Sequence, residues 1–160
     1  MKITPLNSTH WQQVEEIYLQ GIATGNATFE TQSPGWEKWS AAHPENFRFV
    51  SLDENNITGF AALSPVSARH VYRGVAEVMI YVHEDHRGKG IGKELLSYLI
   101  NKSEELGMWT LTAGIFPENI PSIELHKKLG FREVGYRERI GEMNGVWRNT
   151  ILLERRSKII

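Results

Sequence analysis

The sequence contains no cysteine, which excludes disulfides, thiolate metal ligands and a cysteine nucleophile. It also lacks an apolar run long enough to cross a bilayer, for which about 18 to 20 residues are needed. Its first residues, Met1–Pro5, contain no apolar stretch of the signal-peptide kind. We therefore expect a cytoplasmic protein without a membrane partner.

Charge of one sign is not in excess either, because 18 Lys and Arg residues stand against 19 Asp and Glu residues. A nucleic-acid-binding domain normally carries a basic surplus, so we expect no nucleic-acid partner. What the chain does contain is 41% hydrophobic residues, which is typical of a folded protein and not of a disordered one. Its 160 residues show no internal repeat and no Pro/Gly-rich linker, so we expect a single domain over residues 1–160.

Helical and strand patterns both occur along the chain. Apolar residues at helical spacing predict helices over Thr9–Gln20 (with Thr9 and Gln12 as a capping box), a short segment opened by Ser33-Pro34, Arg87–Leu106 and Ile120–Leu129. Strand patterns cover Phe47–Leu52, Ile57–Leu63, Ala76–Val82, Trp109–Phe116, Phe131–Ile140 and Val146–Leu153. Asn144-Gly145 predicts a tight hairpin between the last two strands. Because the elements mix without strict alternation, we expect an α+β fold of the three-layer α/β kind, with a mixed central β-sheet and helices on both faces.

The most informative segment joins a predicted strand to the longest predicted helix and places three glycines there: Gly88, Gly90 and Gly92. Free N–H groups at a helix N-terminus bind phosphate, and glycines allow its close approach. Arg87 and Lys89 add positive charge. The pattern favours a pyrophosphate site, although a plain connecting turn is the alternative. The glycine spacing does not fit the Rossmann fingerprint, and Glu94 stands where a Walker loop has Ser or Thr.

The arrangement Arg-x-x-Gly-x-Gly after a strand, here Arg87–Gly92, resembles the acetyl-CoA site of the GCN5-related N-acetyltransferases (GNAT). The resemblance extends from Thr24 to Arg155. Four separated segments resemble the phosphinothricin and methionine sulfoximine acetyltransferase-like subfamily, namely Asn26–Glu30, Glu77–Val82, Asn119–Phe131 and Gly145–Thr150. The resemblance implies the GNAT fold and acetyl-CoA as cosubstrate.

By this resemblance, acetyl-CoA would lie between the strands Ala76–Val82 and Trp109–Phe116. The main chain of the first strand would hold the pantetheine arm, and the N–H of Val82 would polarise the thioester carbonyl. The residues implied in cosubstrate binding are Tyr81, Val82, His83, Arg87, Gly88, Lys89, Gly90, Ile91, Gly92, Asn119, Ser122 and His126.

Glu77 is the residue that the resemblance implies as general base. A carboxylate among apolar residues has the raised pKa that suits the deprotonation of an ammonium group. Residue types alone favour a surface glutamate on the polar face of an alternating strand. For the proton that CoA takes up on leaving, His126, Tyr136 and water are the candidates.

The acceptor pocket is implied to contain Phe29, Glu30, Arg69, Tyr72, Arg73 and Glu77. Because guanidinium groups bind carboxylates with two parallel hydrogen bonds, Arg69 and Arg73 would hold an acceptor's carboxylate while its amine faces Glu77. The alternative is that both arginines lie on a solvated loop. In the subfamily's Trp-x-Asp pattern, Asn149 replaces the Asp after Trp147, which leaves the role of that position open.

We thus expect an acyltransferase that moves an acetyl group directly to the amine of a small amino-acid-like acceptor of the phosphinothricin, methionine sulfoximine or methionine sulfone type. The alternatives are a protein N-terminus, a polyamine or an aminoglycoside as acceptor, or a non-catalytic acetyl-CoA-binding module. A homodimer is implied by the resemblance alone. The cluster His83–His86 offers possible metal ligands, but four adjacent residues on a turn do not converge on one ion, so we expect no metal.

Overall fold

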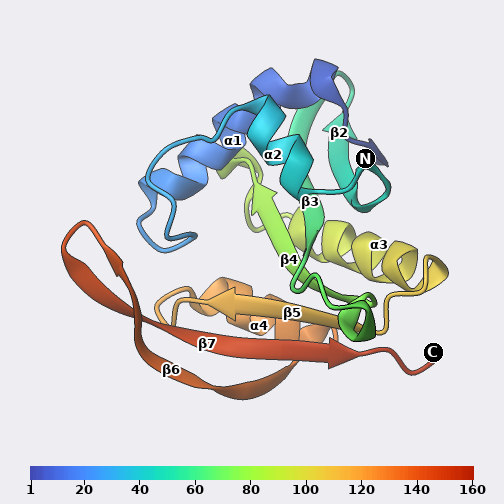
Figure 1. Cartoon of the computed structure of the whole chain (residues 1–160). Helices are drawn as coiled ribbons and strands as arrows, with labels where there is room; N and C mark the ends of the chain where they lie inside the picture. Colours follow the sequence, from blue (N-terminus) through green and yellow to red (C-terminus); the bar gives the residue numbers. More distant parts are fainter.

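The computed structural model describes residues 1–160 and contains one seven-stranded sheet in the order β1-β2-β3-β4-β5-β7-β6 (Figure 1). The strands are β1 (Lys2–Pro5), β2 (Arg48–Asp53), β3 (Asn56–Pro65), β4 (Val75–Val82), β5 (Thr110–Ile115), β6 (Arg132–Met143) and β7 (Val146–Arg156). The pair β4 and β5 is parallel, and the other neighbouring strands are antiparallel. The sheet is therefore mixed, as the sequence predicts.

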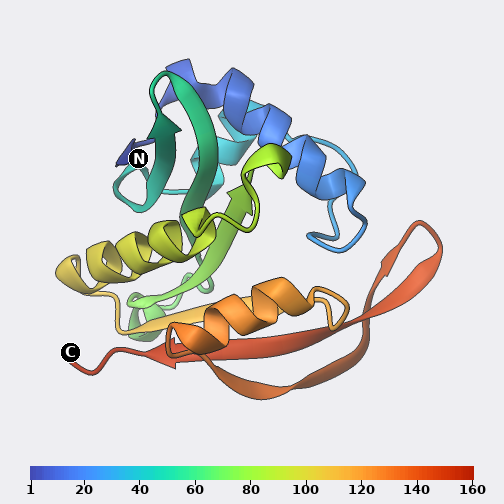
Figure 2. The same cartoon turned by 180° about the vertical axis from the view of Figure 1, so that it is seen from behind.

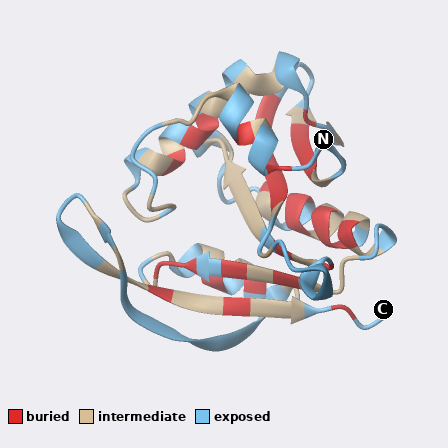
Figure 3. Cartoon of the chain, in the orientation of Figure 1, coloured by how far each residue is buried: buried red, intermediate tan, exposed pale blue.

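Four α-helices cover the two faces of this sheet: α1 (Trp11–Ala23), α2 (Trp36–Ala42), α3 (Ile91–Glu105) and α4 (Ile120–Lys128). Helices α1 and α2 pack over β2 and β3 in one apolar cluster, which includes Trp39 and Phe60. Helices α3 and α4 pack on the opposite face in a second, larger cluster, which includes Leu99 and Ile123 and lies toward the viewer in Figure 2. Figure 3 shows the buried residues of both clusters along the sheet and the inner sides of the helices. The predicted helices on both faces are confirmed.

The helix starts differ from the predicted ones because other residues cap them. The capping residue is Asn7 and not the predicted Thr9. The side chain of Asn7 accepts a hydrogen bond from the N–H of Thr9 (3.0 Å) and caps a 3₁₀ turn, so α1 begins only at Trp11. Ser33-Pro34 likewise lies before α2, whose N-cap is Gly35. The long helix begins at Ile91 and not at Arg87 because a 3₁₀ turn and the left-handed Gly90 precede it. Strand β1 was not predicted, since four residues carry too little periodic pattern.

The sheet parts along the β4–β5 boundary. These strands pair only over Val75–Glu77 and Thr110–Thr112, and beyond Glu77 they diverge (Figure 1). At the other end of the molecule, Asn144 and Gly145 both have positive φ, 51° and 78°, as a type I′ turn requires. The predicted hairpin is confirmed, and β6 and β7 project beyond the rest of the sheet.

Candidate active site

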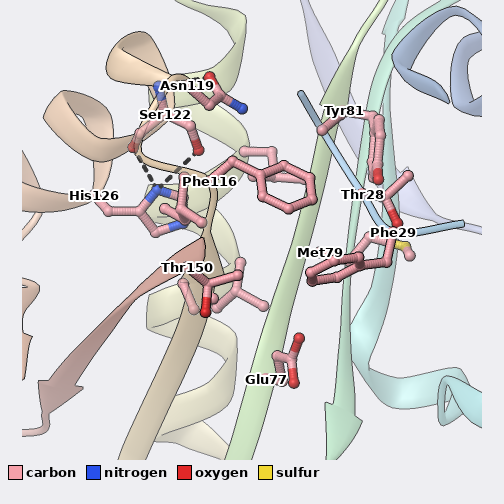
Figure 4. A pocket seen from close by; sticks show the side chains of 16 residues that line it. Thr28, Phe29, Glu77, Met79, Tyr81, Phe116, Asn119, Ser122, His126 and Thr150 are labelled. Atoms are coloured by element: carbon pink, nitrogen blue, oxygen red, sulfur yellow. Dashed lines mark hydrogen bonds between the residues drawn. The ribbon is translucent and has the colours of Figure 1, made fainter. Parts of the chain in front are cut away.

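A cavity with a volume of about 230 Å³ opens where β4 and β5 diverge. Figure 4 shows Glu77 at one end of it and Asn119 with Ser122 at the other. Residues from the α1–α2 loop, β4, β5, α4 and β7 line it: Ala27, Thr28, Phe29, Glu77, Val78, Met79, Ile80, Tyr81, Ala113, Gly114, Ile115, Phe116, Asn119, Ser122, His126 and Thr150. Six of the residues singled out from the sequence are among them, namely Phe29, Glu77, Tyr81, Asn119, Ser122 and His126.

The edge of β4 that faces this cavity has no strand partner beyond Glu77. On its other edge, the N–H of His83 donates to the carbonyl oxygen of Thr58 at 2.9 Å. Because the direction of N–H groups alternates along an antiparallel strand, the N–H of Val82 points away from β3 and toward the gap. Of the three residues predicted to offer main-chain groups here, Val82 thus has its N–H free, while that of His83 is already used.

Helix α3 begins at the far end of the same gap with an unusual run of free donors. Its first intrahelical bond runs from Glu94 N to Gly90 O, and the N–H groups of residues 88–93 donate to no acceptor in the protein. Gly90 has a φ of +85°, and a Cβ there would meet no atom within 4 Å. With the exposed side chains of Arg87 and Lys89 beside them, these donors form an anion-binding helix end.

Glu77 lies where β4 and β5 separate and is the carboxylate that lines the cavity. Partial burial between the strands raises the pKa of Glu77, and the positive charge of Arg137 on β6 opposes this rise. Solvent still reaches the side chain. A carboxylate with these properties can take a proton from an ammonium group in the cavity.

His126 is 98% buried, with an exposed fraction of 2%, and its ring has two unlike nitrogens. Nδ1 lies 2.7 Å from the carbonyl oxygen of Ser122, which can only accept, so Nδ1 carries a proton. Burial lowers the pKa of His126, so the ring is neutral at pH 7 and Nε2, which has no partner, is an acceptor. The predicted role of His126 as proton donor to CoA does not fit this arrangement, whereas an acceptor for a ligand's N–H or O–H does.

Arg148 of β7 fastens the α1–α2 loop over the cavity. Its guanidinium donates to Gly25 O at 2.8 Å and to Asn26 Oδ1 at 2.9 Å, and it stacks 4.0 Å from the ring of Phe116. The Asn119 side chain donates to Asn26 O at 3.2 Å. These contacts hold Phe29 of the loop against Phe116, with ring centroids 4.8 Å apart. The sequence pattern gives no sign of this clamp, because its hydrogen-bond partners lie 93 to 123 residues apart.

Comparison with known proteins gives a consistent result. Residues 11–131 match the acetyltransferase (GNAT) family. The chain is 36% identical to YwnH of Bacillus subtilis over 139 residues, 84% of this chain and 85% of that protein. It is 36% identical to the L-methionine sulfoximine/L-methionine sulfone acetyltransferase of Salmonella typhimurium over 98 residues, 61% of this chain and 57% of that enzyme. The solved structure of a GNAT superfamily phosphinothricin acetyltransferase (Pat) from Sinorhizobium meliloti in complex with AcCoA has a TM-score of 0.87 and 31% identity, covering 97% of this chain and 87% of that one.

The chain belongs to the acetyltransferase (GNAT) family. The resemblance found in the sequence is confirmed, and so are the GNAT fold and the N-acetyltransferase class. The orphaned Nε2 of His126 and the free N–H groups of residues 88–93 fit acetyl-CoA, which offers a pyrophosphate and hydrogen-bond donors along its pantetheine arm.

Tyr136 does not reach the cavity of this acetyltransferase. It pairs with Ile151, which packs against the apolar cluster of α3 and α4, so its side chain lies on that face of the sheet. Thr150, which precedes Ile151 in β7, faces the cavity instead. With 58% of its surface exposed, Tyr136 is not among the residues that line the cavity, so the structure gives no support to its predicted role as proton donor to CoA.

The predicted acceptor arginines also lie elsewhere. Arg69 stacks over Tyr72 and Arg73 over Trp109, with cation–ring distances of 5.4 and 5.2 Å. All three predicted residues of this segment are exposed and none lines the cavity, which agrees with the solvated-loop alternative. Glu30 is exposed and outside the cavity lining too, although its charge raises the pKa of Tyr18 after the larger effect of burial.

Asn149, which replaces the subfamily's Asp, has a local structural role. Its Oδ1 accepts the N–H of Arg139 at 2.7 Å, and Arg139 has a φ of +49° within an irregularity of β6. An amide oxygen accepts this hydrogen bond without carrying a charge.

At the His83–His86 turn, the N–H of Asp85 donates to Nδ1 of His83, and no three His, Cys, Asp or Glu side chains converge as metal ligands. None of the helices has the length and apolar character needed to span a membrane.

Proposed function

We propose that this acetyltransferase transfers the acetyl group of acetyl-CoA directly to the amine of a small amino-acid-like acceptor, with residues 1–160 acting as one catalytic domain. The observation that carries the proposal is the position of Glu77, whose carboxylate lies in the same cavity as the open edge of β4. The named activities of the Salmonella typhimurium and Sinorhizobium meliloti enzymes support an acceptor of the methionine sulfoximine, methionine sulfone or phosphinothricin type.

The chain's residues divide the binding of the acetyl donor between two places. The free N–H groups of residues 88–93, with Arg87 and Lys89, would hold the pyrophosphate. The open edge of β4, with Asn119, Ser122 and the acceptor nitrogen of His126, would hold the pantetheine arm. Acetyl-CoA, when bound, supplies an activated acetyl thioester, and the N–H of Val82 faces the gap in which its carbonyl oxygen gains negative charge.

Glu77 prepares the acceptor, which is mostly an ammonium ion at neutral pH. The carboxylate takes one proton, directly or through a water molecule, and the free amine then attacks the acetyl carbonyl carbon. A carbon–nitrogen bond forms, the carbon–sulfur bond breaks and CoA leaves as thiolate with the bonding electron pair. The nitrogen still carries a second proton, which it must lose to become an amide. Nε2 of His126 holds no proton and Tyr136 is not part of the cavity lining, so water carries this second proton from the nitrogen to the CoA thiolate.

A release assay for CoA thiol tests the proposal. L-phosphinothricin, L-methionine sulfoximine and L-methionine sulfone are compared with a polyamine, an aminoglycoside and a peptide N-terminus. Turnover of the first three and not of the others is expected, with acetyl-CoA binding measured separately by calorimetry. Preferred turnover of the polyamine, the aminoglycoside or the peptide would contradict the acceptor class, and acetyl-CoA binding without any turnover would favour the non-catalytic module.

We also propose that two copies of the chain pair through the hairpin of β6 and β7. β6 is an open edge strand, and such edges readily pair with another chain. Apolar side chains of the hairpin are exposed, namely Val134, Tyr136, Ile140, Val146 and Trp147. Light scattering should give twice the monomer mass, and Trp147→Asp should reduce it; a monomeric wild type would contradict the proposal.

A further inference from the structure

Arg137 of β6 is an exposed cation without a partner, and it lies close enough to the cavity for its charge to act on Glu77. Arg137 pairs across β6 and β7 with Thr150, and paired residues project from the same face of a sheet. Because Thr150 lines the cavity, Arg137 projects from the cavity face. It makes no hydrogen bond and no ion pair, whereas Arg132 on the same strand is bound to Glu154.

The charge of Arg137 reaches Glu77 without touching it. Its field acts on the Glu77 carboxylate, yet the two form no ion pair within the 4.0 Å limit of such contacts. A negative and a positive side chain thus face one open space from β4 and β6. A zwitterion, with an amine and a carboxylate on neighbouring atoms, is the complementary ligand.

Two glycines leave the surface of the sheet between these two side chains almost without side chains. Glu77 pairs with Thr112, and the row of paired residues between this one and the Thr150–Arg137 row is Gly114–Leu152–Gly135. A Cβ built on either glycine would meet no atom within 4 Å. The row of the sheet between Glu77 and Arg137 therefore carries only one side chain, that of Leu152, and leaves space above the two glycines.

We propose that Arg137 binds the α-carboxylate of the acceptor over this row while the acceptor's amine faces Glu77. Arg137 thereby makes the enzyme selective for α-amino acids over amines that lack the carboxylate. A guanidinium suits this task because it can bind both oxygens of a carboxylate at once. The proposal rests on the proposed function, and it assigns to β6 the role that the sequence suggested for Arg69 and Arg73.

Paired substrates and a matched control test the assignment. The kcat/KM values for L-methionine sulfone and for its α-carboxamide are measured with wild type, Arg137→Leu, Arg137→Lys and Arg132→Leu. Arg137→Leu should lower kcat/KM for the acid by about 10- to 100-fold, as expected for a lost hydrogen bond to a charged group, and leave the amide almost unchanged. Arg137→Lys should recover part of the loss. Arg132→Leu, which removes a charge from the same strand and face, should keep the wild-type ratio of acid to amide.

A second variant tests the same space without removing a charge. Gly135→Val places a side chain on the hollow row, and it should lower turnover of the acid while the affinity for acetyl-CoA and the melting temperature stay near wild type. An unchanged ratio of acid to amide in Arg137→Leu would overturn the role of Arg137 and leave the proposed acetyl transfer standing. No turnover of either compound by the wild type, with acetyl-CoA bound, would overturn both.

Discussion

Gly90 and Gly107 stand at opposite ends of α3 with the same φ of +85°, and a Cβ on either would meet no atom within 4 Å. The two positions are equal in backbone strain and in local space. They differ in their surroundings, because only Gly90 lies among the free N–H groups of residues 88–93. This pair therefore separates a ligand effect from a folding effect.

We expect Gly90→Ala and Gly107→Ala to lower the free energy of unfolding by a similar amount, about 1 kcal/mol, because each forces a side chain into the left-handed region. Gly90→Ala should in addition weaken acetyl-CoA binding about tenfold or more, since its methyl group occupies the space for the pyrophosphate. Calorimetric titration measures the affinity and thermal unfolding the stability. Equal acetyl-CoA affinities of the two variants would remove the phosphate site from the α3 terminus.

For Glu77→Gln we expect kcat to fall about 100-fold or more, the usual effect of losing a general base, with little change in acetyl-CoA affinity. Glu77 works in its ionised form, and its pKa is raised by burial. Wild-type activity should therefore fall with decreasing pH at a pH above the ordinary glutamate range, and this acidic limb should be absent from the variant's profile. The same limb in both profiles would mean that another group is the base.

Removal of Arg137 should shift the same acidic limb. Arg137 lowers the pKa of Glu77 against the effect of burial, so Arg137→Leu should move the limb to higher pH. The measurement uses the α-carboxamide substrate, which makes no demand on a carboxylate-binding group. A shift toward lower pH would contradict the electrostatic relation between the two residues.

Arg148→Leu should loosen the α1–α2 loop, since it leaves Gly25 O and Asn26 Oδ1 without their donor. Loss of such bonds costs about 1 to 3 kcal/mol. We expect a higher KM for the acceptor, faster proteolytic cleavage within residues 24–34 and almost unchanged affinity for acetyl-CoA. Arg156→Leu serves as the control, because that guanidinium binds the C-terminal carbonyl groups near Ser157 and Ile160. Equal cleavage of both variants would show that Arg148 does not hold the loop.

Stability should fall as the pH drops below about 6.5, the ordinary pKa of histidine. Burial lowers the pKa of His43 and of His126, so below this pH the unfolded chain binds protons that the folded chain does not. Glu77 acts in the opposite direction within the carboxylate range, because its pKa is raised. In urea unfolding at several pH values, His43→Gln should reduce the pH dependence of the free energy of unfolding. Parallel curves for wild type and His43→Gln would contradict this assignment.

Local features of this chain were predictable from the sequence, and features that depend on strand register were not. The strand, glycine loop and helix around Gly90 follow from spacing within some 30 residues, so their order and a phosphate-binding helix end could be predicted. Acetyl-CoA as the ligand followed only from the resemblance to the GNAT family. Tyr136 and Arg137 are neighbours in sequence, yet they project from opposite faces of the sheet. A one-residue difference in register exchanges those faces, and the irregularities of β6 on either side of Gly135 and Arg137 cannot be read from residue types.

The protonation of His126 was also beyond the sequence. Its spacing from Ser122 correctly suggests that the two share a helix face. In the structure, Nδ1 lies 2.7 Å from the carbonyl oxygen of Ser122 but 3.5 Å from its hydroxyl oxygen. This difference depends on how the ring is rotated in the packed helix. The residue was therefore identifiable as part of the site, while its chemical role was not.

The parting of β4 from β5 has a consequence for the order in which the substrates bind. Only three residue pairs join the two halves of the sheet, so a molecule lying along the open edge of β4 adds the contacts that the missing pairs do not provide. Such a molecule would itself form one wall of the space beside Glu77, a wall that a small acceptor arriving alone would lack. We therefore expect a compulsory sequence, with acetyl-CoA entering before the amine and CoA departing last.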